Sequence, residues 1–118
     1  MQLNEIQYSG VIPVDGYRAG FFRIGGQVLE GAVIVAPDGA RQWAGFEDAE
    51  SLTALAGEVD FVLCGTGADI AHVPAAFRAA IEAAGLGIEQ MNSPSACRTY
   101  NVLASEGRRV ALAVLPVD

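Results

Sequence analysis

Short apolar runs separated by glycine-containing turns dominate the region before residue 45. We predict strands at residues 21–24 and 27–35. They are joined by a tight turn at Gly25-Gly26, because a glycine pair adopts the positive φ angles of a hairpin at little cost. Pro37-Asp38-Gly39 predicts the next turn, followed by a short returning strand at residues 41–44. This region is therefore predicted to be β structure, with an N-terminal hairpin.

The rest of the chain alternates between helical and strand periodicity. Apolar residues at helical spacing predict helices over residues 47–56 and 74–84, and a third beginning at Pro94 with Ser93 as its N-cap. Strands are predicted at residues 61–64, 87–90 and 108–115. The unbroken apolar run at 61–64 indicates a strand covered on both faces, so we expect it to be the central one. The order strand, helix, strand, helix, strand predicts an α/β fold.

The composition indicates one folded domain over residues 1–118. The chain is 52% hydrophobic and 18% charged, which provides enough apolar surface for one core, and no repeat or linker divides it. Acidic residues outnumber basic ones 14 to 7, and the formal net charge of -7 repels phosphate backbones, so no nucleic-acid partner is expected. All seven basic residues are arginines, which excludes a Schiff-base lysine, a phosphate-loop lysine and a lysine general base.

The sequence predicts a cytoplasmic chain without an integral membrane segment. No basic residue precedes Arg18, and the apolar runs near 32–36 and 110–115 are far shorter than the roughly 18 residues of a membrane helix. In a reducing compartment Cys64 and Cys97 are expected to be free thiols. Together with the single histidine they match no zinc-binding spacing, so no metal site is predicted.

Two loops are expected to meet at one edge of the sheet. Gly65-Thr66-Gly67 follows the strand at 61–64, and Asn92-Ser93 follows the strand at 87–90. If those strands are parallel, both loops open at their carboxyl ends, where α/β proteins bind ligands. The following helix start offers free N–H groups, with Arg98 one turn further on, which suits an anion or carboxylate. The competing interpretation is that these glycines only form turns. Ile70 stands where a dinucleotide motif needs its third glycine, so no cofactor is predicted.

Cys97 is the most specific candidate for a catalytic residue, as a thiol nucleophile. It lies in the first turn of the predicted last helix, where the helix dipole can lower the pKa of a thiol, and His72 would be its base only if folding brings the two together. However, Cys97 shares a helical face with apolar residues and Tyr100, which favours a buried, inert thiol and an exposed loop histidine. No complete catalytic set is present, so we expect a binding module. The candidate binding residues are Gly65, Thr66, Gly67, Ser93, Cys97, Arg98 and Tyr100.

Charged and aromatic residues leave two further questions open. Arg98, Arg108 and Arg109 form a cluster that suits an acidic protein partner, unless they pair with surface acids such as Glu106. Tyr17 and Trp43 suit an interface and a half-buried core position equally well. The oligomeric state is not indicated by the sequence.

The segment 91–110 resembles the Mth-like domain family of unknown function, which includes mitochondrial complex I assembly factor three. Its most specific motifs are Ala-Cys-Arg-Thr-Tyr-Asn at 96–101 and Glu-Gly-Arg at 106–108. The likeness extends over nearly the whole chain, including the Ile-Gly-Gly hairpin at 24–26 and the glycine loop at 65–67. The family motif often has threonine where this chain has Ser93; both cap helices, so any hydroxyl-specific chemistry stays open.

The resemblance implies a three-layer single domain with a central mixed sheet, in which one strand runs against the others, and flanking helices. It also implies a cleft near the glycine loop. For function, it implies a role in respiratory complex I assembly through protein partners. The alternative is a small-molecule-binding protein or enzyme that uses the crevice between residues 65–67 and the helix starting near Ser93.

Overall fold

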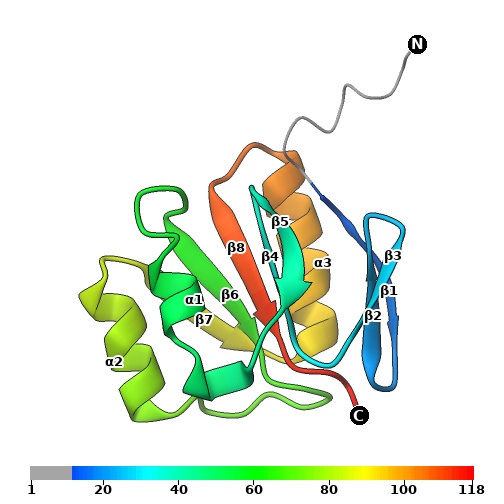
Figure 1. Cartoon of the computed structure of the whole chain (residues 1–118), viewed down its shortest axis with the longest axis horizontal. Helices are drawn as coiled ribbons and strands as arrows, with labels where there is room; N and C mark the ends of the chain where they lie inside the picture. The colour runs from blue at the N-terminus through cyan, green and yellow to red at the C-terminus, as the bar shows by residue number, and fades with distance from the viewer. Residues whose placement is uncertain (1–11) are drawn as a thin grey trace.

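The structure contains a three-stranded antiparallel sheet and a five-stranded mixed sheet (Figure 1). It is a computed structural model and describes residues 12–118. The small sheet has the order β1 (Val14–Arg18), β2 (Phe21–Ile24), β3 (Gln27–Glu30). The large sheet has the order β5 (Gly39–Gln42), β4 (Val33–Ala36), β8 (Val110–Val114), β6 (Phe61–Gly65), β7 (Gly87–Met91). The helices are η1 (Gly45–Glu47), α1 (Glu50–Thr53), α2 (Ala75–Ala83) and α3 (Ser93–Ser105).

One strand of the large sheet runs against the other four. β6 pairs in parallel with both β7 and β8, because α2 and α3 carry the chain back across the sheet between them. β4 is antiparallel to β8 and to β5. This confirms the mixed central sheet that the resemblance implies. The middle strand is β8, however, so the prediction that residues 61–64 form the central strand was wrong; β6 lies between β8 and β7.

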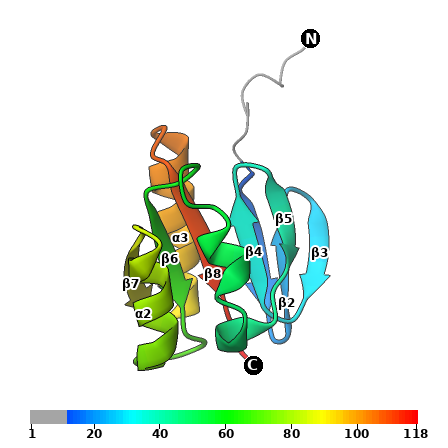
Figure 2. The same ribbon diagram turned by 60° about the vertical axis from the view of Figure 1, so that its left-hand side comes forward.

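Alternate residues of the central strands face two separate cores. Val62 and Ala111 belong to the core under α1 and α2, whereas Leu63 and Leu112 belong to the core under α3 and the small sheet. Figure 2 shows the large sheet between these two layers. The molecule therefore has three layers, as expected from the family resemblance. No helix within residues 12–118 is long and apolar enough to cross a membrane.

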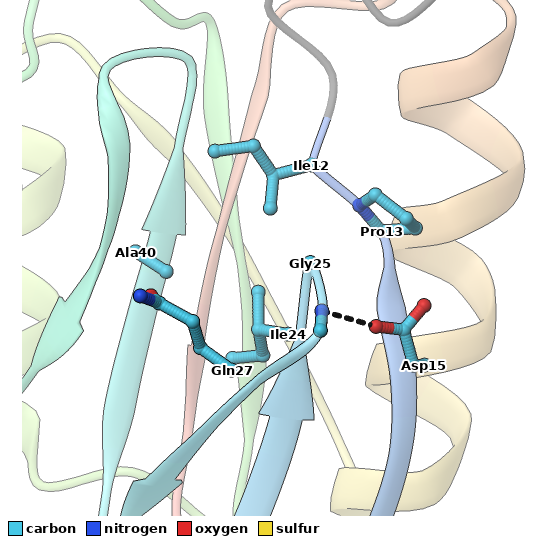
Figure 3. A pocket seen from close by; sticks show the side chains of 8 residues that line it. Ile12, Pro13, Asp15, Ile24, Gly25, Gln27 and Ala40 are labelled. Atoms are coloured by element: carbon cyan, nitrogen blue, oxygen red, sulfur yellow. Dashed lines mark hydrogen bonds between the residues drawn. The ribbon is translucent and has the colours of Figure 1, made fainter. Parts of the chain in front are cut away.

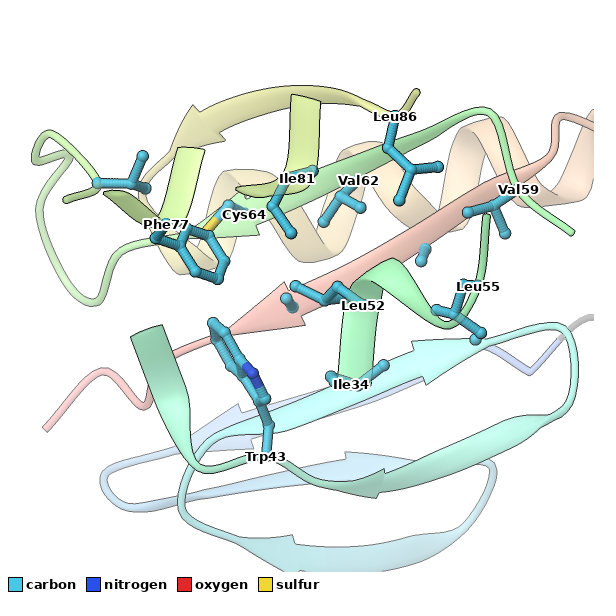
Figure 4. Packing of buried hydrophobic residues seen from close by; sticks show 14 residues of the cluster. Ile34, Trp43, Leu52, Leu55, Val59, Val62, Cys64, Phe77, Ile81 and Leu86 are labelled. Atoms are coloured by element: carbon cyan, nitrogen blue, oxygen red, sulfur yellow. The ribbon is translucent and has the colours of Figure 1, made fainter. Parts of the chain in front are cut away.

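Trp43 anchors the core under α1 and α2 (Figure 4). Its side chain is 5% exposed, and its indole N–H donates a 2.9 Å hydrogen bond to the carbonyl of Asp48. Its ring lies 5.9 Å from the rings of Phe46 and Phe77, a spacing typical of favourable aromatic pairs. The structure thus decides the open question for Trp43 in favour of a core position.

The second core joins α3 to the small sheet. The Asn101 side chain accepts a hydrogen bond from the backbone N–H of Val14 and donates one to its carbonyl, both at 2.9 Å. Tyr17 and Leu29 pack against the same core and are partly buried. The start of β1 is therefore fixed to α3 by one amide side chain.

Two predicted elements differ from the structure, and one strand was not predicted. The predicted strand at 27–35 is two strands in different sheets, because the chain turns at Gly31 with a φ of +78°. In place of the predicted helix at 47–56, the structure has η1 followed by the four-residue α1. Asp48 precedes α1 and stabilises its start, because its carboxylate accepts a hydrogen bond from the Ser51 N–H. β1 had no counterpart among the predicted strands.

Candidate functional site

The loops after β6 and β7 meet at one edge of the large sheet. The Gly67 N–H donates to the hydroxyl of Ser93 at 2.9 Å, and the Ser93 N–H donates to the carbonyl of Gly67 at 2.7 Å. The Thr66 N–H donates to the carbonyl of Met91 at 2.9 Å. The structure therefore brings together the two loops that the sequence placed at one edge.

Ser93 links three distant segments through one hydroxyl. Its side chain is 0% exposed, and its Oγ accepts from Gly67 and donates to the carbonyl of Leu115 at 2.6 Å. A buried hydroxyl needs such partners to offset its loss of hydration. Ser93 is the first residue of α3, and the N-cap is Asn92, whose Oδ1 accepts from the Ser95 N–H at 2.8 Å. The prediction of Ser93 as N-cap was therefore wrong by one residue.

Gly65 is required by the close approach of α3 to β6. A Cβ atom at this position would lie 2.8 Å from both the Cα and the Oγ of Ser93, and 2.7 Å from a methyl carbon of Val114. Only a residue without a side chain fits such a contact. The space between Gly65 and Ser93 is thus filled by protein atoms, so the expected crevice is closed at this point.

Thr66 organises the loop that leads to α2. Its hydroxyl donates to the carbonyl of Asp69 at 2.8 Å and accepts from the Ala71 N–H at 2.9 Å. Between these two residues the side chain of Ile70 is 61% exposed. The loop therefore has an internal polar bridge and presents an apolar side chain to solvent.

His72 and Cys97 lie on different faces of the large sheet. His72 is exposed, and its Nδ1 lies 3.2 Å from the side-chain nitrogen of Gln90, next to α2. Cys97 is 3% exposed in the core under α3. Burial raises the pKa of the Cys97 thiol to about 12, with only a partial opposing effect of Arg98. This is the opposite of the lowered pKa that a thiol nucleophile needs.

Of the seven candidate residues, Thr66 and Arg98 retain exposed surface. Arg98 is exposed, and its guanidinium donates to the hydroxyl of Ser95 at 3.3 Å. Burial also raises the pKa of Tyr100 to about 12, since its ring lies in the core under α3. The buried candidates are Gly65, Gly67, Ser93, Cys97 and Tyr100.

The two arginines near the start of β8 have structural partners. Arg109 lies 3.4 Å from the carboxylate of Asp60 and donates to the carbonyl of Gly57 at 3.0 Å. The guanidinium of Arg108 lies over the ring of Phe61, 5.6 Å from its centroid. The surface pairing expected for this cluster is present for Arg109, but with Asp60 instead of Glu106.

Sequence reasoning missed two hollows next to the small sheet. The first, of about 480 Å³, lies between the β2–β3 turn and β5 and is bordered by Ile12, Ile24 and Ala40 (Figure 3). At its edge the Asp15 carboxylate accepts a 2.7 Å hydrogen bond from the Gly26 N–H. The second, of about 450 Å³, lies over β1 and β2. Neither has a sequence motif, because each is formed by residues whose proximity depends on strand register.

Residues 14–115 match the family described as "Protein of unknown function (DUF498/DUF598)". The chain belongs to this family. An uncharacterised protein of Rhodobacter capsulatus is 50% identical over 117 residues, which cover 99% of this chain and 94% of that protein. The human NADH dehydrogenase (ubiquinone) 1 alpha subcomplex assembly factor 3 is 30% identical over 110 residues, which cover 87% of this chain and 60% of that longer protein.

Solved structures agree with this family assignment. The solution structure of a Bordetella pertussis protein described as an Mth938-like domain has a TM-score of 0.76 and 26% identity, with 99% of this chain and 93% of that chain covered. A crystal structure from Bartonella henselae, described as an outer membrane protein, has a TM-score of 0.82 and 28% identity, with 93% and 98% covered. The family resemblance and the Mth-like three-layer fold are confirmed.

Proposed function

We propose that this chain is a non-enzymatic binding module that supports assembly of a respiratory complex through protein partners. The observation that carries the proposal is its 30% identity, over 87% of its length, to a protein named as an assembly factor of NADH dehydrogenase. The matched region spans 60% of that protein, so the proposal concerns the shared domain. We further propose that residues 1–118 act as one domain in the cytoplasm, in keeping with the free thiols of Cys64 and Cys97.

The proposed contact surface is the edge where the loop after β6 meets the start of α3. Thr66 and Gly67 form the loop side of this junction, and Arg98 provides an exposed guanidinium on the helix side. Ile70 adds an exposed apolar side chain. Ser93 fixes the two sides to each other, which limits the ordering cost of binding. A carboxylate of the partner would pair with Arg98, as arginine favours planar, two-pronged contacts.

Deleting the native gene and measuring assembled NADH dehydrogenase tests this proposal. The amount of complex is read from native gels stained for NADH oxidation, with rescue by wild-type chain, Arg98→Glu or Arg41→Glu. Arg41 is the matched control because its reversal changes the charge equally, and its present partner is Asp38 in the β4–β5 turn. We expect Arg98→Glu to restore less of the complex than wild-type chain does. Like charges at an interface cost several kcal/mol, so this change should weaken partner binding about tenfold or more. Arg41→Glu should rescue fully.

Two results would overturn the assembly role. One is an unchanged amount of complex in the deletion strain. The other is an affinity-tagged chain that recovers no NADH dehydrogenase subunit or assembly protein from the same cells. Arg109→Glu is a poorer probe than Arg98→Glu, because it also breaks the contacts of Arg109 with Gly57 and Asp60.

The alternative of an enzyme in the crevice near Ser93 depends on a reactive Cys97. Its alkylation rate, measured against pH in the folded chain and in urea, separates the two functions. We expect slow reaction in the folded chain at neutral pH, because burial raises the pKa of this thiol to about 12. Fast alkylation with a midpoint near neutral pH would favour the enzyme.

A further inference from the structure

The small sheet uses only one of its faces to pack against the core. On β2, Phe22 is buried, so its neighbours Phe21 and Arg23 point to the other side. Strand register extends this outward row: Arg18 of β1 lies opposite Phe21, and Val28 of β3 lies opposite Arg23. Val28 is 53% exposed. In Figures 1 and 2 no helix or strand of residues 12–118 lies over this side.

The outward face has a hollow at Gly16, because glycine has no side chain to fill it. Gly16 lies opposite Arg23 in the sheet, and a Cβ atom placed there would have no other atom within 4 Å. Phe21 contributes an aromatic side chain to the wall, whereas Tyr17, which lies opposite the inward-facing Phe22, borders the hollow from within β1. The hollow measures about 450 Å³ and is lined by Asp15, Gly16, Tyr17, Arg18, Phe21 and Arg23.

Among residues 12–118 the arginines of this hollow lack carboxylate partners, although the chain has twice as many acidic as basic residues. Within residues 12–118, neither Arg18 nor Arg23 has a carboxylate within 4 Å. Arg18 donates one 3.3 Å hydrogen bond to the carbonyl of Tyr17. The arginines that do have carboxylate partners are Arg41, Arg78 and Arg109. Two guanidinium groups thus flank a hollow that contains Phe21, and most of their N–H groups have no acceptor among residues 12–118.

Two acids limit the positive area. Asp15 lines the hollow, but one of its carboxylate oxygens already accepts a hydrogen bond from the Gly26 N–H, toward the β2–β3 turn. Glu30 lies opposite Phe21 on the side of β3. The positive area is therefore confined to the β1–β2 side, and it is too small for a polyanion such as nucleic acid, which the net charge of -7 repels.

We propose that the outward face of β1 and β2 is a docking site for an extended, acidic segment of a partner protein. A carboxylate of that segment binds between Arg18 and Arg23, and an adjacent apolar side chain packs on Phe21 within the hollow. The docking site rests on the proposed function in one respect only, which is that both assume a protein partner. The pairing of guanidinium with carboxylate gives orientation, and the apolar contact excludes water from the pair. An extended segment fits because alternate side chains of a strand reach one surface.

A peptide titration tests the chemistry of this face. The probe is the capped peptide Gly-Glu-Ser-Leu-Ser-Glu-Gly, in which an extended backbone directs the leucine and both glutamates to one side. Amide resonances of ¹⁵N-labelled chain are followed as peptide is added. We expect shifts confined to residues 14–24 and 28, and none with a counterpart in which glutamine replaces both glutamates. Equal shifts from the uncharged peptide or from free succinate, shifts elsewhere, or no shifts at millimolar peptide would overturn the proposal.

Gly16→Val provides a steric test without an expected loss of fold. No atom lies within 4 Å of its new Cβ, and valine favours strands, so the melting temperature should equal or exceed that of wild type. The valine fills the hollow, so peptide affinity should fall about tenfold, as it should in Arg23→Glu, where the charge is reversed. Arg41→Glu, with the same charge change, should bind within about twofold of wild type. Wild-type affinity in Gly16→Val would overturn the docking site.

The gene-deletion assay separates this inference from the assembly role. If wild-type chain is needed for the complex but the peptide does not bind, or binds Gly16→Val with wild-type affinity, the docking site is wrong and the assembly role stands. If the chain is not needed but the peptide binds as expected, the assembly role is wrong and the docking site stands.

Discussion

Replacing Ser93 with alanine tests how much the junction of three segments contributes to stability. Ser93→Ala removes the acceptor for the Gly67 N–H and the donor to the Leu115 carbonyl. Gly67 is buried, so its N–H is left without a partner, whereas Leu115 is half-buried, so the loss of the donor to its carbonyl costs less. A buried polar group without a partner costs about 1–3 kcal/mol. With the partial loss at Leu115, we expect the free energy of unfolding to fall by about 2–3 kcal/mol.

Urea unfolding followed by tryptophan fluorescence measures this change. Trp43 is the single tryptophan and is buried in the native core, so its emission reports unfolding directly. For a chain of this length the expected loss corresponds to a melting temperature lower by about 8–12 °C. Ser105→Ala is the control on the same helix. Its exposed hydroxyl donates to the carbonyl of Val102 one turn earlier, so the change should alter stability by less than about 0.5 kcal/mol. A Ser93→Ala loss as small as that of the control, with an unchanged m value, would refute the reasoning.

Three further changes test the same structure. Gly65→Ala should lower the free energy of unfolding by about 1–3 kcal/mol, because its Cβ would lie 2.7 Å from Val114; urea unfolding at wild-type stability would contradict the close contact. Burial raises the pKa of Cys97 from 9.0 to about 12. The neutral thiol therefore contributes fully to the free energy of unfolding below pH 9, and this contribution is lost as the pH rises toward 12. Stability measured over that range should therefore decline less steeply in Cys97→Ala. Asn101→Ala should leave both backbone groups of Val14 without their partner and speed amide hydrogen exchange in β1; unchanged exchange would argue against the link to α3.

Periodicity was sufficient to predict the half of the chain that contains α2, β7, α3 and β8. Each of these elements has an uninterrupted pattern of its own, and helix starts and stops carry local signals such as Pro74 and Gly85. The meeting of the loops after β6 and β7 also followed from the sequence, since it depends only on parallel strands joined by a helix.

The small sheet was not predictable in the same way. The turn at Gly31 lies between two stretches of strand-forming residues, so the sequence predicted one strand where the structure has two strands with different partners. β1 contains Gly16 and a register shift between Val14 and Gly16, both of which obscure strand alternation. Which strand pairs with which depends on packing against α3, and that information is not local in the sequence.

At Gly65 the expected crevice is closed, for a physical reason that residue types do not reveal. Glycine after a strand can open a ligand site or allow a helix to approach, and the sequence signal is the same for both. At Gly65 the second applies, because the backbone of Ser93 occupies the space. Likewise Asn92, Asn101 and Thr66 act through bonds to backbone atoms, which leave no motif in spacing or charge.

The position of β8 means that the large sheet is completed only after its other four strands have been synthesised. β8 is the strand between β4 and β6, yet it is the last strand within residues 12–118. Until residues 110–114 leave the ribosome, β5–β4 and β6–β7 are two separate strand pairs with apolar edges that lack a neighbour. Such edges are the surfaces on which nascent chains aggregate. The two pairs therefore become one sheet only when β8 is available to pair with both β4 and β6.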